Sequence, residues 1–386
     1  MLSSAIAQRI LTLEQAIALA SDSALEAFKN KNLYLSGYWE FRSFKANRLP
    51  SVTLNLMPAN YNRGFVSRYD SEEDIEFYGL QRFYAANGGL LIEQNLDLLG
   101  GTFFIESGLQ YLRYMGDHAF NQFSAVPISI GYKQDLIGYN PFRWEKKIEP
   151  LKYEKVKKEF LYNTERIAEE ATSYFFALAM AQAEYDLAVK NKRAADTLFA
   201  IGQKKFDITA ITTDELYTLE LEKVNAYNSF KTAELDLRRA MVTLVTYLNL
   251  APGTELRLLL PSRTHQYQLS AEEALREARK NNPTYLSTRQ DILEAQKELD
   301  KTRREAMFQA SFSASVGFNQ AGTSLKGAYR DPMRQDMVAI SVSIPLLDWG
   351  VRKGKYRMAK NNLNVVEISS RQSEVAVEQS VVMAVN

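Results

Sequence analysis

The feature that most constrains the fold is a long stretch that reads as helix with a single break. From Leu151 to Ala251 the chain has no proline and one glycine, Gly202. Small and apolar residues recur there in steps of four and three, close to the 3.5-residue period of a coiled coil. A helix from Arg143 to Phe206 would be roughly 95 Å long at 1.5 Å per residue. A compact globular domain does not need so long a rod, so we expect the helix to span the distance between two separate structures.

The same period continues beyond a turn near Ile208, which predicts an antiparallel helical hairpin. If the chain reverses there, residues whose numbers sum to 415 face each other, as Tyr185 faces Phe230.

Two lysines interrupt this seam. Lys192 and Lys223 also sum to 415, and their neighbours along the seam are apolar or small. Two like charges in a dry seam are costly. We therefore expect both ammonium groups to turn toward Asp196 and Glu220, which lie within helical reach, or toward water. The pair is interpreted either as snorkelling side chains or as a compliant point in the coiled coil.

Three short segments alternate cleanly between apolar and small or polar residues. The apolar positions are Val52, Leu54 and Leu56; Phe312, Ala314, Val316 and Phe318; and Val338, Ile340, Val342 and Ile344. Such alternation suits any half-buried sheet, and it also suits strands between lipid and water. In that second case Ala339, Ser341 and Ser343 would face the water.

One further hairpin is expected from Gly89 to Met115, with its turn at Gly100-Gly101. Residues 60–88 carry several aromatic residues and the acidic run Glu72-Glu73-Asp74, and we interpret them as a long loop.

The chain also repeats itself. A shift of 258 residues places Thr12, with Gln15 three residues on, over Ser270 with Glu273, and both read as helix caps. A shift of 212 places Ile128-Ser129-Ile130-Gly131 over Ile340-Ser341-Val342-Ser343, so the second copy is shorter by 46 residues between its strands. Each copy reads as helix, helix, strand region and long helix.

These patterns predict a division of the chain into consecutive segments. They are a signal-peptide remnant at 1–7, short helices at 8–48, strands and a loop at 49–140, a helical hairpin at 141–251 with its tip near 206–213, a linker at 252–268, short helices at 269–306, strands at 307–348, and the truncated start of a second long helix at 349–386. The remnant is inferred from the small-x-small sequence Ala5-Ile6-Ala7 before Gln8.

Composition excludes several classes of function. Lys+Arg number 47 against 46 Asp+Glu, so no basic excess points to nucleic acid. There is no cysteine, and the 2 histidines lie far apart in sequence. The chain shows no nucleophile–base set, phosphate loop or metal-ligand cluster, so we expect no enzyme activity, no cofactor and no metal.

The strands and the rod together suggest a duct. Four strands, or six with the additional hairpin, are too few for a single-chain membrane barrel, which starts at about 8. Open edges are not tolerated in lipid, so several chains would have to pool their strands. The alternative is a soluble periplasmic coiled-coil scaffold or adaptor whose strands form a small soluble domain.

The sequence resembles the TolC-like outer membrane efflux protein family over nearly its whole length, from Leu11 onward. The run from Gly202 to Leu216 is similar to the family's hairpin tip, and Ile344-Pro345-Leu346-Leu347-Asp348-Trp349-Gly350 to its passage from strand to helix. The counterpart of that passage is Gln134 to Pro141. The run from Gly138 to Trp144 resembles members from Bacteroidetes-type bacteria.

The resemblance implies an α+β membrane protein with two internal repeats. Three chains would pool four strands each into a 12-stranded outer membrane β-barrel, continued by an antiparallel coiled-coil tunnel in the periplasm. The extra hairpin leaves four or six strands per chain open.

By the same resemblance, this homotrimer would be the passive channel of a tripartite efflux pump or type I secretion system. It would work with an inner-membrane transporter and a periplasmic adaptor. The tip residues implied to dock the adaptor are Phe206, Asp207, Ile208, Thr209, Ala210, Ile211, Thr212, Thr213 and Asp214. No gating residue can be assigned, because the family places its gate at a second hairpin tip that this sequence does not include.

Overall fold

A computed structural model describes residues 9–70, 75–97, 99–116, 119–261 and 269–385. The expected signal-peptide remnant at 1–7 and the run Glu72–Asp74 lie outside these residues. The chain divides into two compact units. One comprises the chain up to Ser36, Val156–Pro283 and the chain from Val381, and the other comprises Gly37–Lys155 and Thr284–Ser380. Each unit therefore draws on both sequence repeats.

The first unit is helical, with one small sheet. Its elements are β1 (Arg9–Thr12), α1 (Leu13–Ser23), the start of α2 (Leu25–Ala46), most of α3 (Pro141–Asp207), α4 (Thr213–Tyr247), β6 (Leu256–Leu259) and α5 (Ala271–Asn281). The expected caps are present. Thr12 and Gln15 form a reciprocal capping box at the start of α1, and Ser270 accepts a hydrogen bond from the Glu273 amide at the start of α5. The parallel pairing of β1 with β6 was not predicted.

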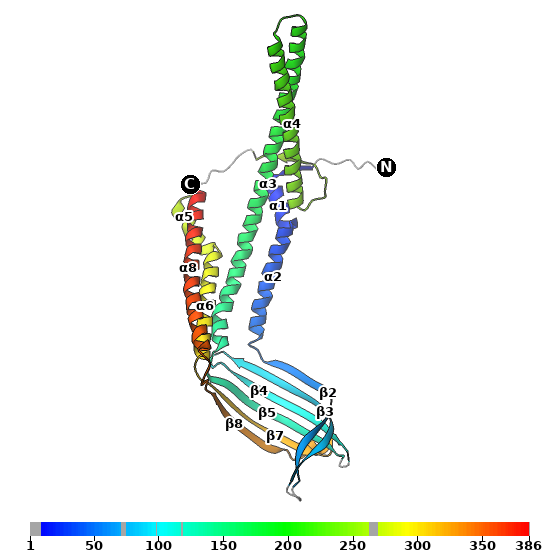
Figure 1. The fold of residues 1–386 in the computed structure, drawn as a ribbon, viewed down its shortest axis with the longest axis vertical. Helices are drawn as coiled ribbons and strands as arrows, with labels where there is room; N and C mark the ends of the chain where they lie inside the picture. The colour runs from blue at the N-terminus through cyan, green and yellow to red at the C-terminus, as the bar shows by residue number, and fades with distance from the viewer. Residues whose placement is uncertain (1–8, 71–74, 98, 117–118, 262–268, 386) are drawn as a thin grey trace. The chain divides into compact units, whose positions relative to one another are not determined.

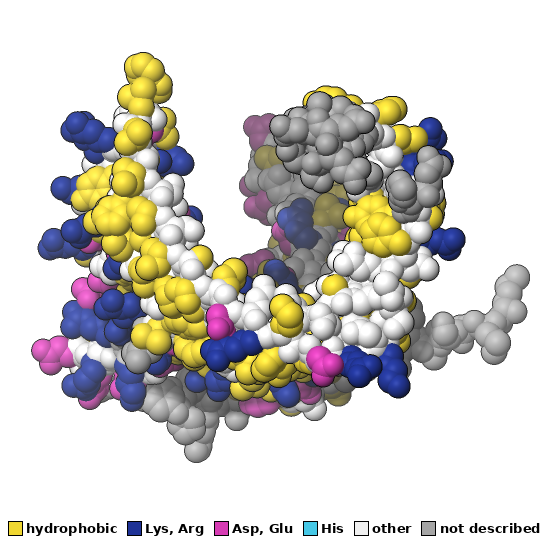
Figure 2. Space-filling model, turned by 90° about the horizontal axis from the view of Figure 1, so that it is seen from below, with side chains coloured by type: hydrophobic (Ala, Val, Ile, Leu, Met, Phe, Trp, Pro, Cys, Tyr) yellow, Lys and Arg dark blue, Asp and Glu magenta, His cyan; other side chains and the backbone are white. Residues whose placement is uncertain are grey.

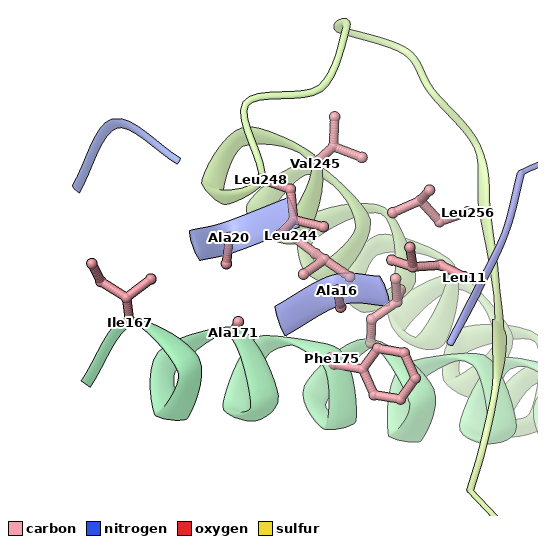
Figure 3. Packing of buried hydrophobic residues seen from close by; sticks show 11 residues of the cluster. Leu11, Ala16, Ala20, Ile167, Ala171, Phe175, Leu244, Val245, Leu248 and Leu256 are labelled. Carbon is pink, nitrogen blue, oxygen red and sulfur yellow. The ribbon is translucent and has the colours of Figure 1, made fainter. Parts of the chain in front are cut away.

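The core of this unit lies where α1, α3, α4 and the small sheet meet. Phe175, Leu178 and Leu244 are fully buried, and the small side chains of Ala16 and Ala20 let α1 approach closely. Figure 3 shows residues from these elements pointing toward one another. The unit is therefore held by packing in which alanines set the distance between helices.

The α3–α4 hairpin has the Tyr185–Phe230 contact that the seam predicts, but contacts nearer the tip depart from that register. Gly202 approaches Leu219 and Lys223 approaches Phe199, and these numbers sum to 421 and 422 instead of 415. The rings of Tyr185 and Phe230 lie 5.7 Å apart between centroids. At the other end of the hairpin, the Tyr247 hydroxyl donates to the Ile167 carbonyl at 3.1 Å and also contacts a Glu170 carboxylate oxygen at 3.2 Å. Burial, and then the nearby Glu170, raises the pKa of Tyr247. That phenol therefore stays protonated and able to donate.

The second unit contains a six-stranded antiparallel sheet (Figure 1). Its strands, in spatial order, are β2 (Ser51–Asp70), β3 (Ile75–Leu96), β4 (Gly101–Met115), β5 (Asn121–Ile137), β7 (Gln309–Gly322) and β8 (Met333–Ser343). Among the described residues, these six strands pair into one sheet, and the other two strands, β1 and β6, pair with each other. The choice between four and six strands is thus resolved as six.

The prediction of a long loop over residues 60–88 is wrong. β2 continues to Asp70 and β3 begins at Ile75, and the two strands pair along this length. The register shifts between Met57 and Asn60, around Pro58. A bulge adds one residue to a strand and so exchanges its two faces. The alternation that begins at Val52 therefore breaks at Pro58 although the strand does not.

The remaining elements of this unit are helical. They are the end of α2, the start of α3, α6 (Thr284–Glu305), the short α7 (Leu325–Ala328) and most of α8 (Val351–Val385). In support of the repeat, α1 and α5 each have 11 residues, and α2 and α6 each have 22. Pro150 lies inside α3, which continues through it.

Polar contacts fix these helices near the sheet. The Trp144 indole donates to Asp300 at 3.0 Å, and Arg304 donates to the same carboxylate at 2.9 Å. Arg48, which follows α2, pairs with Asp97 at 2.8 Å. Among the described residues, no helix is both long enough and apolar enough to cross a membrane.

Candidate functional site

One face of the six-stranded sheet is apolar and open to solvent. Residues directly opposite in an antiparallel pair share a face, so the register can be followed across all six strands. This apolar face carries Val52, Leu54 and Leu56; Leu90 and Ile92; Phe103 and Ile105; Ile128 and Ile130; Val316 and Phe318; and Val338, Ile340 and Val342. Val52 is 63% exposed and Ile340 65% exposed, so aliphatic side chains that normally form a core have no cover in the single chain.

The opposite face is mostly small and polar. This polar face carries Thr53 and Asn55; Glu93; Thr102 and Glu106; Ser129 and Lys133; Ser311, Ser313 and Ser315; and Ala339, Ser341 and Ser343. Lys133 pairs with Glu93 at 3.0 Å across the intervening strand β4. Figure 2 shows hydrophobic side chains gathered in a band, with backbone and uncharged polar atoms beside it.

The expected parity of β8 is present in the pairing. Val338, Ile340 and Val342 lie on the apolar face, and the alternate residues lie on the polar face. Ile344, predicted as the last apolar position, follows the end of β8. Toward the other end of β8 the apolar face becomes charged, with Arg334 and Asp336 paired at 3.0 Å. The apolar band therefore has an edge along the strands.

Aromatic side chains flank the aliphatic band on the same face. Where β4 begins, the rings of Phe103 and Tyr132 are 4.8 Å apart. Toward its end, Tyr111 lies 6.4 Å from Tyr84 and 4.9 Å from Phe123. Two aromatic rows enclosing an aliphatic band are typical of strands that cross a membrane.

The predicted tip residues lie together at the turn between α3 and α4. α3 closes with a Schellman motif, in which the Thr209 and Ala210 amides donate to the Phe206 and Lys205 carbonyls, each at 2.8 Å. Thr209 has φ 58°, the left-handed conformation that usually belongs to glycine at this position. Ile208 is 72% exposed beside it. The turn thus presents an apolar side chain on a tightly bonded loop.

The start of α4 is fixed by hydrogen bonds, as the end of α3 is. Thr212 caps α4 by accepting from the Glu215 amide at 3.3 Å, and Glu215 accepts from the Thr212 amide at 2.8 Å. Hydrogen bonds from the Thr212 backbone and then from its hydroxyl lower the pKa of Glu215. Gly202 lies one turn below, where a Cβ would come within 2.3 Å of Leu219, so only glycine allows this close approach without a shift.

The two seam lysines behave differently from each other. Lys192 pairs with Asp196 at 2.7 Å, which confirms the expected ion pair. The Lys223 ammonium instead lies over the ring of Phe199, 4.5 Å from its centroid. The seam spacing did not predict this cation–π contact, because in that register Lys223 faces Lys192.

The run from Ile344 to Gly350, which precedes α8, contains a helix cap. Asp348 accepts hydrogen bonds from the amides of Gly350 at 3.0 Å and Arg352 at 3.1 Å, and these bonds lower its pKa. Trp349, between them, has φ 54° and is 90% exposed. Leu346 and Leu347 are exposed as well, so an apolar patch lies next to the end of β8.

No family model matches the chain, and no curated protein matches its sequence. Solved structures do match it. The CmeC outer membrane channel of Campylobacter jejuni is 11% identical, with a TM-score of 0.65 over 94% of this chain and 68% of that one. The outer membrane protein VceC of Vibrio cholerae is 11% identical, with a TM-score of 0.63 over 94% and 75%. The MtrE outer membrane channel of Neisseria gonorrhoeae is 14% identical, with a TM-score of 0.61 over 97% and 72%. At these identities the likeness concerns the fold: this chain has the fold of TolC-like outer membrane channels, as the resemblance predicted.

Proposed function

We propose that the protein is an outer membrane channel with helices that extend into the periplasm, where it acts as the passive export duct of a tripartite efflux pump or type I secretion system. Three copies pool their sheets into one barrel and their helical hairpins into a tunnel. An inner-membrane transporter supplies the energy, and a periplasmic adaptor links the transporter to the hairpin tips. The proteins that share the fold are channels rather than enzymes, and this chain is assigned no chemistry.

The observation that carries the proposal is the uncovered apolar face of the sheet. Burying apolar surface contributes roughly 25 cal/mol per Å². A soluble scaffold would therefore cover side chains such as Leu54, Ile130 and Ile340, which in this chain are 62%, 45% and 65% exposed. Lipid covers such a face without any partner protein. The polar face, with its serines, then borders water.

The tip is proposed as the adaptor contact. Residues Phe206 to Asp214 form a short ordered turn with an exposed isoleucine, and the Schellman motif and the capping box satisfy the backbone at either side. Such a turn offers a partner side chains on a rigid support. The Lys204–Lys205 pair before it and Asp214 at its end add charges of both signs.

Single-channel recording tests the channel assignment. Purified protein added to a planar lipid bilayer should give discrete conductance steps, and the protein should be extracted from membranes only by detergent. It should also migrate on unboiled gels as a trimer that boiling dissociates. Release from the periplasm without detergent, together with an absence of conductance, would instead support the soluble scaffold.

The docking assignment needs a separate test. Replacing Thr209-Ala210-Ile211 with three charged residues should abolish export while the trimer and its conductance stay unchanged. Glutamates at Asn191 and Asn228, two exposed positions on the shaft of the hairpin, serve as the control and should leave export intact. Normal export by the tip variant would contradict the assignment.

A further inference from the structure

Both edges of the sheet are open. Among the described residues, β2 pairs only with β3, and β8 pairs only with β7. Each edge strand therefore has main-chain N–H and C=O groups that point away from the sheet without a partner strand. Unsatisfied backbone groups cost several kcal/mol each in lipid, so an open edge cannot face it.

The two edges are complementary. Every neighbouring pair in the sheet is antiparallel, so the first and the sixth strand run in opposite directions. β8 of one copy can thus pair with β2 of the next copy and continue the alternation. The apolar faces match too, because Val52 to Leu56 and Val338 to Val342 lie on the same side of the sheet. An apolar outer surface would run across this junction without a break.

The inner hairpin β3–β4 cannot be left out of such a wall. β3 pairs with β4 over 15 successive residue pairs, from Arg82↔Met115 to Leu96↔Gly101. β4 in turn pairs with β5, which joins the strands of the second repeat. The aliphatic band crosses the hairpin at Leu90, Ile92 and Ile105. The extra residues of the first repeat therefore add two strands to the wall itself.

We propose that β8 of each copy pairs with β2 of the next, so that three copies with six strands each close an 18-stranded barrel rather than the 12-stranded one that the resemblance implies. This inference rests on the proposed function, since it takes the trimer and the membrane from it. Barrel diameter grows roughly linearly with strand number, so the barrel is about 1.5 times as wide. Its cross-section is about twofold larger, which suits a bulkier cargo than a 12-stranded barrel passes.

Disulfide crosslinking tests the junction, and the chain has no cysteine of its own to confuse the result. One set of variants combines a cysteine at Thr53 or Asn55 of β2 with a cysteine at Ala339, Ser341 or Ser343 of β8, all on the polar face. A second set combines the β2 cysteine with a cysteine at Ser129 or Lys133 of β5, because β2 and β5 would become neighbours if the β3–β4 hairpin were left out of the wall. Disulfides need Cα atoms within about 4.4–6.8 Å, whereas three strand spacings of about 4.8 Å separate β2 from β5 in the six-stranded sheet.

The proposal expects at least one β2–β8 pair to form covalent dimers and trimers on boiled, non-reducing gels, and no β2–β5 pair to form a disulfide. β2–β5 disulfides, seen as a change in the mobility of the single chain on non-reducing gels, would overturn the 18-stranded barrel but keep the trimeric channel. An unboiled trimer without any β2–β8 crosslink would also overturn it. No trimer and no crosslink in either set would remove the proposed function together with the inference.

Discussion

Thr209 is the residue whose backbone conformation is least expected from its side chain. It occupies the left-handed region at φ 58°, where a β-branched residue is strained by roughly 1–2 kcal/mol. Asn249 closes α4 with the same two hydrogen bonds at φ 53°, but asparagine tolerates this region. We expect Thr209→Gly to stabilise the tip by about 1 kcal/mol, and Asn249→Gly to change little. Hydrogen exchange of the Ala210 amide should slow in the first variant. Equal effects of the two substitutions would argue against strain at Thr209.

Asp300 makes the stability of its unit depend on acid. Burial alone would raise its pKa, but hydrogen bonds from Trp144 and Arg304 outweigh that effect and lower it. A lowered folded pKa means that this stabilisation is present above the ordinary carboxyl value of about 3.9 and is lost as the pH falls through the folded value.

Trp144→Phe should therefore lower the free energy of unfolding by about 1–3 kcal/mol at pH 7. The loss should be smaller at pH 3, because the stabilisation by this carboxylate declines below about 3.9. Thermal unfolding followed by circular dichroism in detergent measures both values. Trp39→Phe is the control, because Trp39 is 56% exposed and should have little effect at either pH. A loss for Trp144→Phe that is the same at pH 3 would mean that the carboxylate is not its cause.

At the scale of elements, the approach of α3 to α4 near the tip depends on the pair Gly202 and Leu219. Alanine is favoured over glycine inside a helix by about 1 kcal/mol, but a Cβ at Gly202 would lie 2.3 Å from Leu219 Cδ1. Gly202→Ala should therefore stabilise the hairpin in a Leu219→Ala background. In the natural sequence, the same substitution should stabilise the hairpin less or should destabilise it. A double-mutant cycle on thermal unfolding should give a coupling of about 1 kcal/mol. Additive effects of the two substitutions would show that α3 and α4 can move apart at this point without a loss of stability.

The elements also show what a sequence can and cannot predict. The contact of Tyr185 with Phe230 followed from the seam period, because coiled-coil neighbours recur at a fixed spacing. Nearer the tip, Gly202 instead approaches Leu219, six residues away from that register. The strands β2 and β3 were only partly recognised, because the bulge at Pro58 exchanges their faces and hides the alternation. The contact of Lys223 with Phe199 was missed for another reason. A side chain as long as lysine reaches a neighbouring turn, which spacing alone does not fix.

At the scale of the whole molecule, the sheet has two features that the proposed assembly would account for. Among the described residues, nothing covers the apolar face and no further strand pairs with the two edges. Neither feature suits an isolated protein in water. Both are satisfied when several copies close a barrel in lipid.

Adjacent residues on β8 allow this to be tested with a single change of side chain. Ile340 lies on the apolar face and is 65% exposed, whereas Ser341 lies on the polar face. An arginine facing lipid costs about 2–4 kcal/mol at the middle of the membrane and less near its surfaces, while an arginine facing the lumen stays in water. We expect Ile340→Arg to reduce the amount of trimer in the outer membrane fraction. Ser341→Arg should assemble normally and should shift the ion selectivity toward anions, because it adds positive charge to the lumen of every copy. Quantifying the trimer on unboiled gels and measuring the reversal potential in a salt gradient would separate the two. If Ser341→Arg impaired assembly and Ile340→Arg did not, the two faces of the sheet would have to be exchanged.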